Sequence, residues 1–359
     1  MELVARVLAF AAGAALALSI LASALRTVVV PRAEPSVLTR AVFLSVRKLF
    51  LMRVKKADGW DAADRIMARY APVTLMLLPA VWLAGMVLAF TPMFWALGSE
   101  FPREAFTRSG SSIFTLGFAF ARDLPETTLS FVAATVGLVL VALLIAFLPS
   151  IYAQFSRREV LVGQLDTRAG TPPDPAVLLE RAVRIDWLEE LDDLWIAWDQ
   201  WFVELEETHT SNVALPFFRS QHPGRSWLTA AGCVLDTASL RASALDLPRT
   251  FKAELCIRSG FLALRRIADA FDIPHDPDPA PTDPISVTRP EFEEVCDRLV
   301  AVGAPVRADR DQAWRDFAGW RVNYDEVLVR LCAVIVAPTA PWSSDRSLTT
   351  YRPPLRRRR

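Results

Sequence analysis

Apolar positions gather in three long uncharged stretches in the first half of the chain. They cover residues 7–25, 71–97 and 129–155. An α-helix rises about 1.5 Å per residue, so roughly 20 apolar residues cross the hydrocarbon core of a bilayer. The pattern therefore predicts an all-α membrane protein with an N-terminal span inside residues 1–31 and two further spans between residues 71 and 158.

The first stretch has a competing interpretation, because secretory signal peptides also begin with an apolar segment. The uncharged run is longer than the roughly 7–15 apolar residues of such peptides. It also ends in the sequence Leu-Arg-Thr-Val-Val-Val-Pro-Arg. We expect a retained membrane anchor.

Charge gives these spans an orientation. Between Arg26 and Arg69 there are ten basic and four acidic residues, and basic loops stay in the cytoplasm. The linker 32–70 is therefore predicted to be cytoplasmic, with the N-terminus and residues 98–128 outside the cell membrane. Three of the four lysines lie within residues 48–56 beside apolar side chains, which suits either an interfacial helix on anionic lipids or a solvated loop.

Beyond the last span the hydrophobic pattern becomes that of a soluble helical domain. A Gly/Pro break at residues 168–173 marks the boundary. Apolar residues then recur at a spacing of three to four, with the tryptophans at 187, 195, 198 and 201 on one stripe, which we interpret as core. The pattern predicts a bundle of five or six helices over residues 171–345. The expected helices cover residues 175–184, 185–207, 226–245, 249–272, 290–303 and 309–337.

Composition sharpens this division into two halves. The 359 residues are 52% hydrophobic, with 40 Lys+Arg and 40 Asp+Glu. Residues 1–158 carry 16 basic and 9 acidic side chains, whereas residues 159–359 carry 24 and 31. An acidic domain disfavours nucleic-acid binding. The basic tail, residues 346–359, is expected to be disordered and to meet anionic lipid or the acidic helices of a neighbouring subunit.

The acidic half carries no recognisable catalytic or cofactor motif. Its four cysteines have no C-x-x-C spacing, and the chain's three histidines are well separated, so a zinc site is not expected. Reduced core cysteines are the simplest interpretation. There is also no Gly-rich phosphate loop and no catalytic triad in the sequence. We expect neither an enzyme nor a bound cofactor.

The segment between the last two spans is unusually apolar at its centre. Pro102 and Glu104 suit the start of a short helix, which is predicted over residues 103–114. The string Thr-Leu-Gly-Phe-Ala follows at residues 115–119, and the last span then occupies residues 127–158. This order resembles the two-helix pore module of the potassium-channel superfamily, whose filter pattern is T-x-G-[YF]-G. The resemblance covers residues 71–158.

The resemblance implies a re-entrant loop whose backbone carbonyls replace the hydration shell of a permeating monovalent cation, K⁺ in that family. One loop per chain implies a homotetramer. It also assigns Gly137 to a hinge in the inner helix, while Pro149 would bend the part that lines the gate. The implied filter residues are Thr115, Leu116, Gly117, Phe118 and Ala119.

Two departures from the family pattern leave alternatives open. Ala119 replaces the second filter glycine, and a left-handed backbone there would cost about 1–2 kcal/mol. Arg122 lies at the outer mouth and would repel cations unless Asp123 or Glu126 neutralises it. A potassium channel, a less selective cation channel, and a non-conducting scaffold or sensor that uses the module to tetramerise all remain possible from the sequence.

Overall fold

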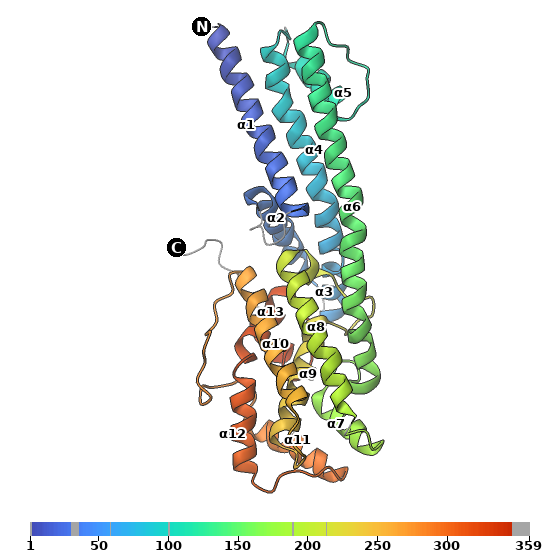
Figure 1. Cartoon of the computed structure of the whole chain (residues 1–359), viewed down its shortest axis with the longest axis vertical. Coiled ribbons are helices and arrows are strands. Elements are labelled where there is room, and N and C mark those ends of the chain that lie inside the picture. Colours follow the sequence, from blue (N-terminus) through green and yellow to red (C-terminus); the bar gives the residue numbers. More distant parts are fainter. Residues whose placement is uncertain are drawn as a thin grey trace. The chain divides into compact units, whose positions relative to one another are not determined.

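The chain folds into two compact units of helices. A computed structural model describes residues 2–29, 36–57, 59–99, 101–188, 190–212 and 214–346, without the side chains of residues 59–61. The apolar unit comprises Met1–Arg53 and Arg69–Ala153, and the polar unit comprises Val54–Ala68 and Gln154–Arg359. Within the described residues there are helices but no strands, apart from one isolated bridge between Leu245 and Val306 (Figure 1). Of the predicted disordered tail 346–359, Arg346 is ordered at the end of a 3₁₀ turn and pairs with Glu291, and residues 347–359 lie outside the described residues.

The apolar unit is built from long apolar helices. Its elements are α1 (Glu2–Val28), α2 (Val37–Val54), α4 (Tyr70–Ala96), α5 (Pro102–Ile113) and the first part of α6 (Leu124–Ala169). In the described part of the chain, three helical segments are long and apolar enough to cross a membrane: Glu2–Val28, Ala62–Ala96 and Leu124–Ala169. The prediction of three helices with spanning length and composition is confirmed.

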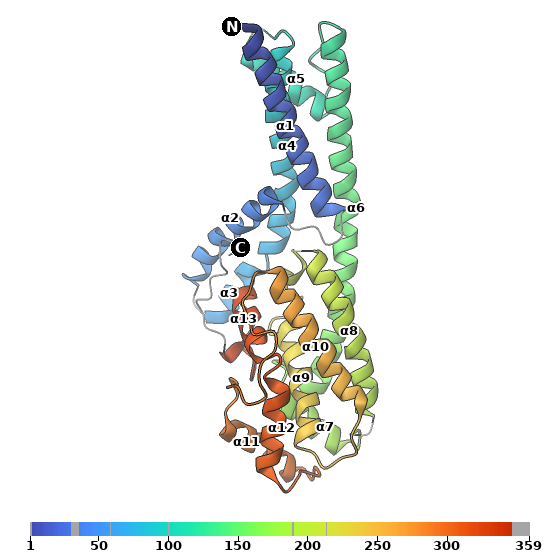
Figure 2. The same ribbon diagram turned by 60° about the vertical axis from the view of Figure 1, so that its left-hand side comes forward.

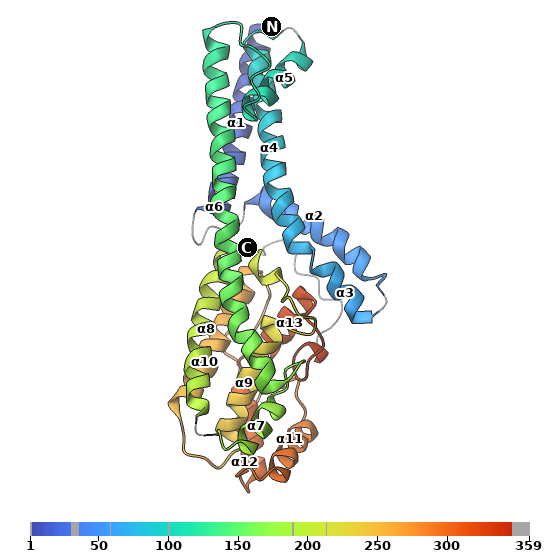
Figure 3. The ribbon, with the colours of Figure 1, turned by 90° about the vertical axis from the view of Figure 1, so that its right-hand side faces the viewer.

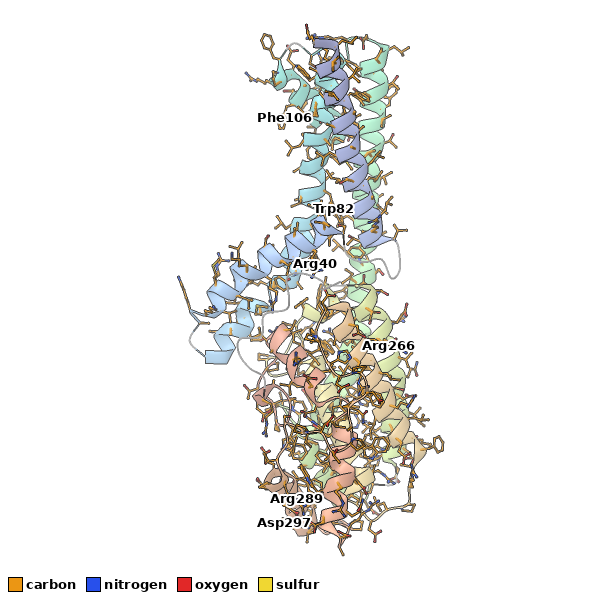
Figure 4. The ribbon with its side chains drawn as sticks, turned by 90° about the vertical axis from the view of Figure 1, so that its left-hand side faces the viewer. Arg40, Trp82, Phe106, Arg266, Arg289 and Asp297 are labelled. Atoms are coloured by element: carbon orange, nitrogen blue, oxygen red, sulfur yellow. The ribbon has the colours of Figure 1, made fainter. Side chains whose placement is uncertain are left out.

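Helix α1 packs tightly against α4. At Gly13 a Cβ atom would lie 2.5 Å from the carbonyl oxygen of Ala89, so only glycine permits this approach. Further along α1, the indole Nε1 of Trp82 donates to Ser23 Oγ at 3.3 Å (Trp82 is labelled in Figure 4). Helix α1 is therefore an integrated part of the apolar unit.

Different short helices lie at the two ends of the apolar unit. The start of α1 and the whole of α5 lie at one end of the unit (Figure 1). Helix α2 lies at the opposite end and is inclined to the long helices (Figures 2 and 3). The predicted linker 32–70 is thus largely helical where it is described, since α2 ends at Val54 and α3 (Gly59–Met67) follows within the polar unit.

The polar unit is a bundle centred on α9 (Trp227–Ser243). This helix is buried on nearly every side, which agrees with a sequence that is small or apolar all around. Helices α8 (Leu191–Ser211) and α10 (Phe251–Ala270) pack side by side, as Figure 3 shows. The remaining elements of the described part are α7 (Pro175–Arg184), α11 (Arg289–Ala301), α12 (Arg310–Arg321), α13 (Asp325–Ile335) and the 3₁₀ turns η1 (Leu215–Phe217) and η2 (Ser344–Arg346).

Two helix boundaries in this unit were predicted wrongly. Helix α8 begins at Leu191 instead of residue 185, because Asp186 adopts a left-handed φ of +53° and ends the preceding helix. The predicted helix 309–337 is two helices, since the chain breaks between Arg321 and Asp325. The described residues from 175 to 335 therefore form seven α-helices, one more than the upper expected number.

The tryptophan stripe of α8 is confirmed as core. Trp195, Trp198 and Trp201 are all buried. The rings of Trp198 and Trp201 stack at a tilt with centroids 4.5 Å apart. Trp187 lies before the helix begins and is only partly buried, with the guanidinium of Arg168 over its ring at 5.4 Å.

A buried charge network joins α9 to α12 and α13. Arg321 is fully buried, and its guanidinium pairs with Asp236 and, at 2.7 Å, with Asp325. The hydroxyl of Tyr324 donates to the same Asp236 Oδ1 at 2.8 Å. This network explains the break between α12 and α13, because it turns Arg321, Tyr324 and Asp325 inward together with no glycine or proline at the break.

Candidate functional site

The segment between α4 and α6 folds back deep along both helices. Ser109 of α5 donates from Oγ to the carbonyl oxygen of Val87 at 2.8 Å. Val87 lies nine residues before the end of α4, which corresponds to about 14 Å along the helix. Helix α5 therefore descends beside α4 instead of lying across its end.

The far end of α5 reaches a similar depth against α6. A Cβ atom on Gly137 would lie 2.0 Å from the carbonyl oxygen of Ile113, the last residue of α5. Gly137 is thirteen residues beyond the start of α6, so this contact lies about 20 Å from that end of the helix. The connection from Phe114 to Asp123 must therefore return over about the same distance to the start of α6. The loop is thus re-entrant within the apolar unit.

The backbone of the predicted filter leaves the helix with two left-handed residues. Thr115 has a φ of +53° and Gly117 a φ of +71°, whereas Ala119 does not lie in this region. The cost expected for a left-handed backbone at Ala119 therefore does not arise in this conformation. Ser111 fixes the segment, since its carbonyl accepts from Leu116 N at 2.8 Å and its Oγ from Ala119 N at 3.2 Å.

The carbonyl groups of this segment are available to a ligand. Among the described residues no hydrogen bond is donated to the carbonyl oxygens of residues 115–118. The side chains of Leu116 and Phe118 are each 60% exposed in the single chain. Non-helical backbone at membrane depth is tolerated only where it lines water or is covered by protein. This segment therefore needs further cover or a water-filled space beside it.

A buried ion pair closes the re-entrant loop near the start of α6. Arg108 of α5 pairs with Glu126 of α6 at 2.5 Å, and their side chains are only 10% and 1% exposed. Arg108 also donates to Ser99 Oγ at 3.2 Å, and Glu126 accepts from the backbone N–H of Arg122 at 2.8 Å. The pair thus holds α5, the loop exit and the start of α6 together.

Arg122 is neutralised by Glu104, a residue that the sequence linked only to the start of a helix. Its guanidinium pairs with Glu104 in the first turn of α5 at 2.8 Å. Glu126 is occupied by Arg108, and Asp123 accepts from the backbone N–H of Glu126 at 2.9 Å, as a cap of α6. Neither of the two candidates from the sequence, Asp123 and Glu126, pairs with the Arg122 side chain.

The two predicted gating residues lie in one uninterrupted helix. Helix α6 runs from Leu124 to Ala169, well past the predicted limits 127–158. Pro149 lies inside it with its side chain exposed, and the helix continues across it. At Gly137 the structure gives a reason for glycine other than a hinge, which is the close approach of Ile113.

The lower part of α6 is clamped within the polar unit by Arg158. This buried arginine donates to the carbonyl oxygens of Leu215 at 3.1 Å and Phe218 at 2.8 Å. It also lies 3.2 Å from His209 Nε2. Burial, with the nearby Arg158 charge, lowers the pKa of His209 well below its ordinary value. The imidazole is therefore neutral at physiological pH, so its Nε2 can accept from Arg158.

A second arginine holds the segment that leads into α4. Arg219 pairs with Asp64 of α3 at 3.3 Å. Its other nitrogen donates to the carbonyl oxygens of Ile335 at 2.6 Å and Val336 at 2.7 Å, at the end of α13. The chain entering α4 and the chain leaving through α6 are thus both anchored in the polar unit.

Other chemistry is not visible in the described part of the chain. No group of three or more His, Cys, Asp or Glu side chains there could hold a metal ion. Cys233, Cys256, Cys296 and Cys332 are buried free thiols, as expected. Comparison with known proteins adds no family, because no family model, curated protein or solved structure matches the chain.

Proposed function

We propose that this protein is a passive cation channel of the pore-loop type, assembled from four chains in the cell membrane. The observation that carries the proposal is the depth of the re-entrant loop. Ile113 meets Gly137 about 20 Å along α6, and a non-helical segment with free carbonyls follows immediately. This is the arrangement that an ion filter requires, since carbonyl oxygens replace water around the ion.

In this proposal the filter carbonyls of residues 115–119 face a shared axis and coordinate a monovalent cation. The exposed side chains of Leu116 and Phe118 pack against neighbouring copies. The negative end of the α5 dipole favours a cation at the inner side of the filter. Arg122 does not block entry, because Glu104 balances its charge.

The polar unit would act as a cytoplasmic regulator in this proposal, with the N-terminus outside. Helix α6 is continuous from the loop to Arg158, and α3 leads directly into α4. A rearrangement of the bundle would therefore move both pore helices through Arg158 and Arg219. Gly137 and Pro149 are the positions where α6 would bend.

Ion flux into liposomes tests the proposal. We expect K⁺ flux from reconstituted wild-type protein, with Na⁺ flux measured in parallel to define selectivity. Gly117→Val should abolish the flux, because a β-branched residue is strained at a φ of +71°. Gly110→Ala is the matched control, since its Cβ would meet no atom within 4 Å.

Two results would contradict the proposal. One is the absence of wild-type flux above that of empty liposomes at any voltage, pH or calcium concentration tested. The other is undiminished flux in Gly117→Val. A stable tetramer without flux would favour the alternative function, a non-conducting scaffold or sensor.

A further inference from the structure

The polar unit contains a cavity of about 550 Å³ at the point where three helices meet. Its wall is formed by the end of α9, the start of α10 and the outer side of α12. This volume lies within the roughly 300–1,000 Å³ typical of small-molecule sites. The cavity belongs to the polar unit alone and is separate from the re-entrant loop.

Four arginines line this cavity, which we call the arginine cavity: Arg241, Arg249, Arg307 and Arg315. The only carboxylates among its lining residues are Glu254 and Asp316. The lining is therefore positive by two charges, although the sequence from residue 159 to 359 carries more acidic than basic residues. A concentration of positive charge in an acidic domain favours an anionic ligand.

The arginines are only partly satisfied by carboxylates. Arg249 pairs with Glu254, and Arg307 lies 3.3 Å from Asp316 while it donates to the carbonyl oxygens of Leu245 and Ala242. Arg241 instead donates to the carbonyl oxygen of Pro248 at 2.8 Å, and Arg315 to the amide oxygen of Gln312 at 2.7 Å. Burial lowers the pKa of Arg241, Asp192 opposes this shift, and the like charge of Arg307 adds to it. An anion between Arg241 and Arg307 would relieve this repulsion.

The remaining walls add a dipole and an aromatic surface. Thr250 caps the start of α10, a helix of 20 residues, and lines the cavity, so the positive end of the α10 dipole lies at the cavity wall. Trp320 of α12 lines the cavity on another side, together with the apolar side chains of Leu247 and Pro281. Tryptophan and arginine both offer flat surfaces on which a planar ring can stack.

We propose that the arginine cavity binds an organic anion of nucleotide size that carries two or more phosphate groups. The phosphates lie against the arginines, which match phosphate oxygens in a bidentate geometry. The planar ring lies against Trp320. This site needs no glycine-rich phosphate loop, and it is independent of whether the chain conducts ions.

Calorimetric titration of the full-length protein in detergent tests this proposal. The probes are ATP, ADP, AMP and pyrophosphate at low salt. We expect saturable binding of ATP and ADP, binding of AMP at least tenfold weaker, and a dissociation constant that rises with salt, since screening weakens the charge interactions. Trp320→Ala should weaken ATP about tenfold while leaving pyrophosphate unchanged.

Charge variants identify the site. Arg249→Gln and Arg315→Gln should each weaken ATP by roughly tenfold, because each removes a charge-assisted contact. Both side chains are on the surface, and Arg315 bonds only within its own helix, so the fold should survive. Arg330→Gln is the matched control, since this residue pairs with Glu326 on α13 and does not line the cavity.

Each unfavourable result overturns the proposal. No saturable binding of ATP at millimolar concentration and low salt would remove the site. ATP binding that is unchanged in Arg249→Gln and Arg315→Gln would place the anion elsewhere. Pyrophosphate binding as tight as ATP would overturn the organic class of ligand, because Trp320 would then contribute nothing.

Discussion

Gly137 sets how closely α5 approaches α6. The position accepts no side chain, since even a Cβ atom would lie 2.0 Å from the backbone oxygen of Ile113. A backbone atom cannot move aside as a flexible side chain can. The sequence resemblance suggested a hinge at this position, whereas the structure adds a packing requirement that holds the inner end of the loop.

Gly137→Ala should therefore disrupt the loop although alanine favours a helix. We expect a loss of ion flux and a loss of roughly 1–3 kcal/mol in the free energy of unfolding, as for other overpacked sites. Thermal unfolding in detergent measures the second effect as a lower midpoint temperature. Gly163→Ala in the same helix is the control, because its Cβ would meet only Arg225 Nη1 at an ordinary 3.5 Å. That variant should be neutral or slightly stabilised. Unchanged flux in Gly137→Ala would contradict the packing role.

In the polar unit the residue with the strongest structural role is the buried Arg321. It balances Asp236 and Asp325, all within the bundle interior. Burial raises the pKa of Asp236 to about 6, while Arg321 and Tyr324 act in the opposite direction. A carboxyl with a raised pKa in the folded state makes the fold less stable as the pH rises from about 4 to 6, because only the unfolded chain releases its proton early.

Arg321→Gln should raise the pKa of Asp236 further, because it removes the positive charge that favours the ionised carboxylate. The pH range over which the fold loses stability should therefore extend above pH 6. We expect a loss of roughly 3–5 kcal/mol in unfolding free energy at pH 8, and a smaller loss at pH 5. Tryptophan fluorescence during thermal unfolding measures both. Arg330→Gln, which removes a partly exposed pair with Glu326, should cost less than about 1 kcal/mol at either pH. Equal losses of Arg321→Gln at both pH values would refute this account.

At the level of elements, α5 shows what a sequence can predict and what it cannot. Its observed limits, Pro102–Ile113, differ by one residue from the predicted 103–114, because Pro102 and Glu104 are strong local start signals. Neither the left-handed position Asp186 nor the break after Arg321 is marked by glycine or proline. Periodicity alone therefore started one helix too early and joined two other helices into one.

The Arg108–Glu126 pair was missed for a different reason. The two residues are 18 positions apart, and neither helix periodicity nor the filter string connects them. One physical signal was present, since a charged residue in a re-entrant helix requires a buried partner and Glu126 follows within the next helix. The re-entrant loop was expected from the resemblance, but the pair that closes it depends on how α5 and α6 pack in three dimensions.

Glu126→Gln tests how much α5 depends on this closure. The variant leaves Arg108 buried without a carboxylate. We therefore expect a loss of roughly 3–5 kcal/mol in the free energy of unfolding and a loss of ion flux. Glu104→Gln is the control of equal chemistry, because it removes only the partly exposed pair with Arg122 and should cost less than about 1 kcal/mol. Similar losses of unfolding free energy in the two variants would show that the buried pair has no special role.

For the whole molecule, the exposed surface of α6 is the main indication of assembly. Only 17% of its most apolar part is buried within one chain, against 44% in Ala62–Ala96. Lipid can cover such a surface, but lipid cannot satisfy the free carbonyls of residues 115–118. The two observations together favour neighbouring copies around the loop.

The purified protein should therefore be a tetramer in mild detergent and in lipid nanodiscs. We expect light scattering to give a protein mass about four times the 39.9 kDa of one chain. Disruption of the loop by Gly137→Ala should shift the mass toward the monomer, whereas Gly163→Ala should not. A monomeric or dimeric wild type in nanodiscs would leave no closed pore.

Arg219 contacts segments that are synthesised at very different times. Its partners at Ile335 and Val336 lie 116 and 117 residues further along the chain, while Asp64 is made long before it. During synthesis the apolar helices must enter the bilayer while α3 still lacks its docking site. Growth to the end of α13 is needed before that site is complete. A chain truncated before Val336 would keep the Arg219–Asp64 pair but lose a carbonyl that orients Arg219, so we expect α3 to be held less firmly.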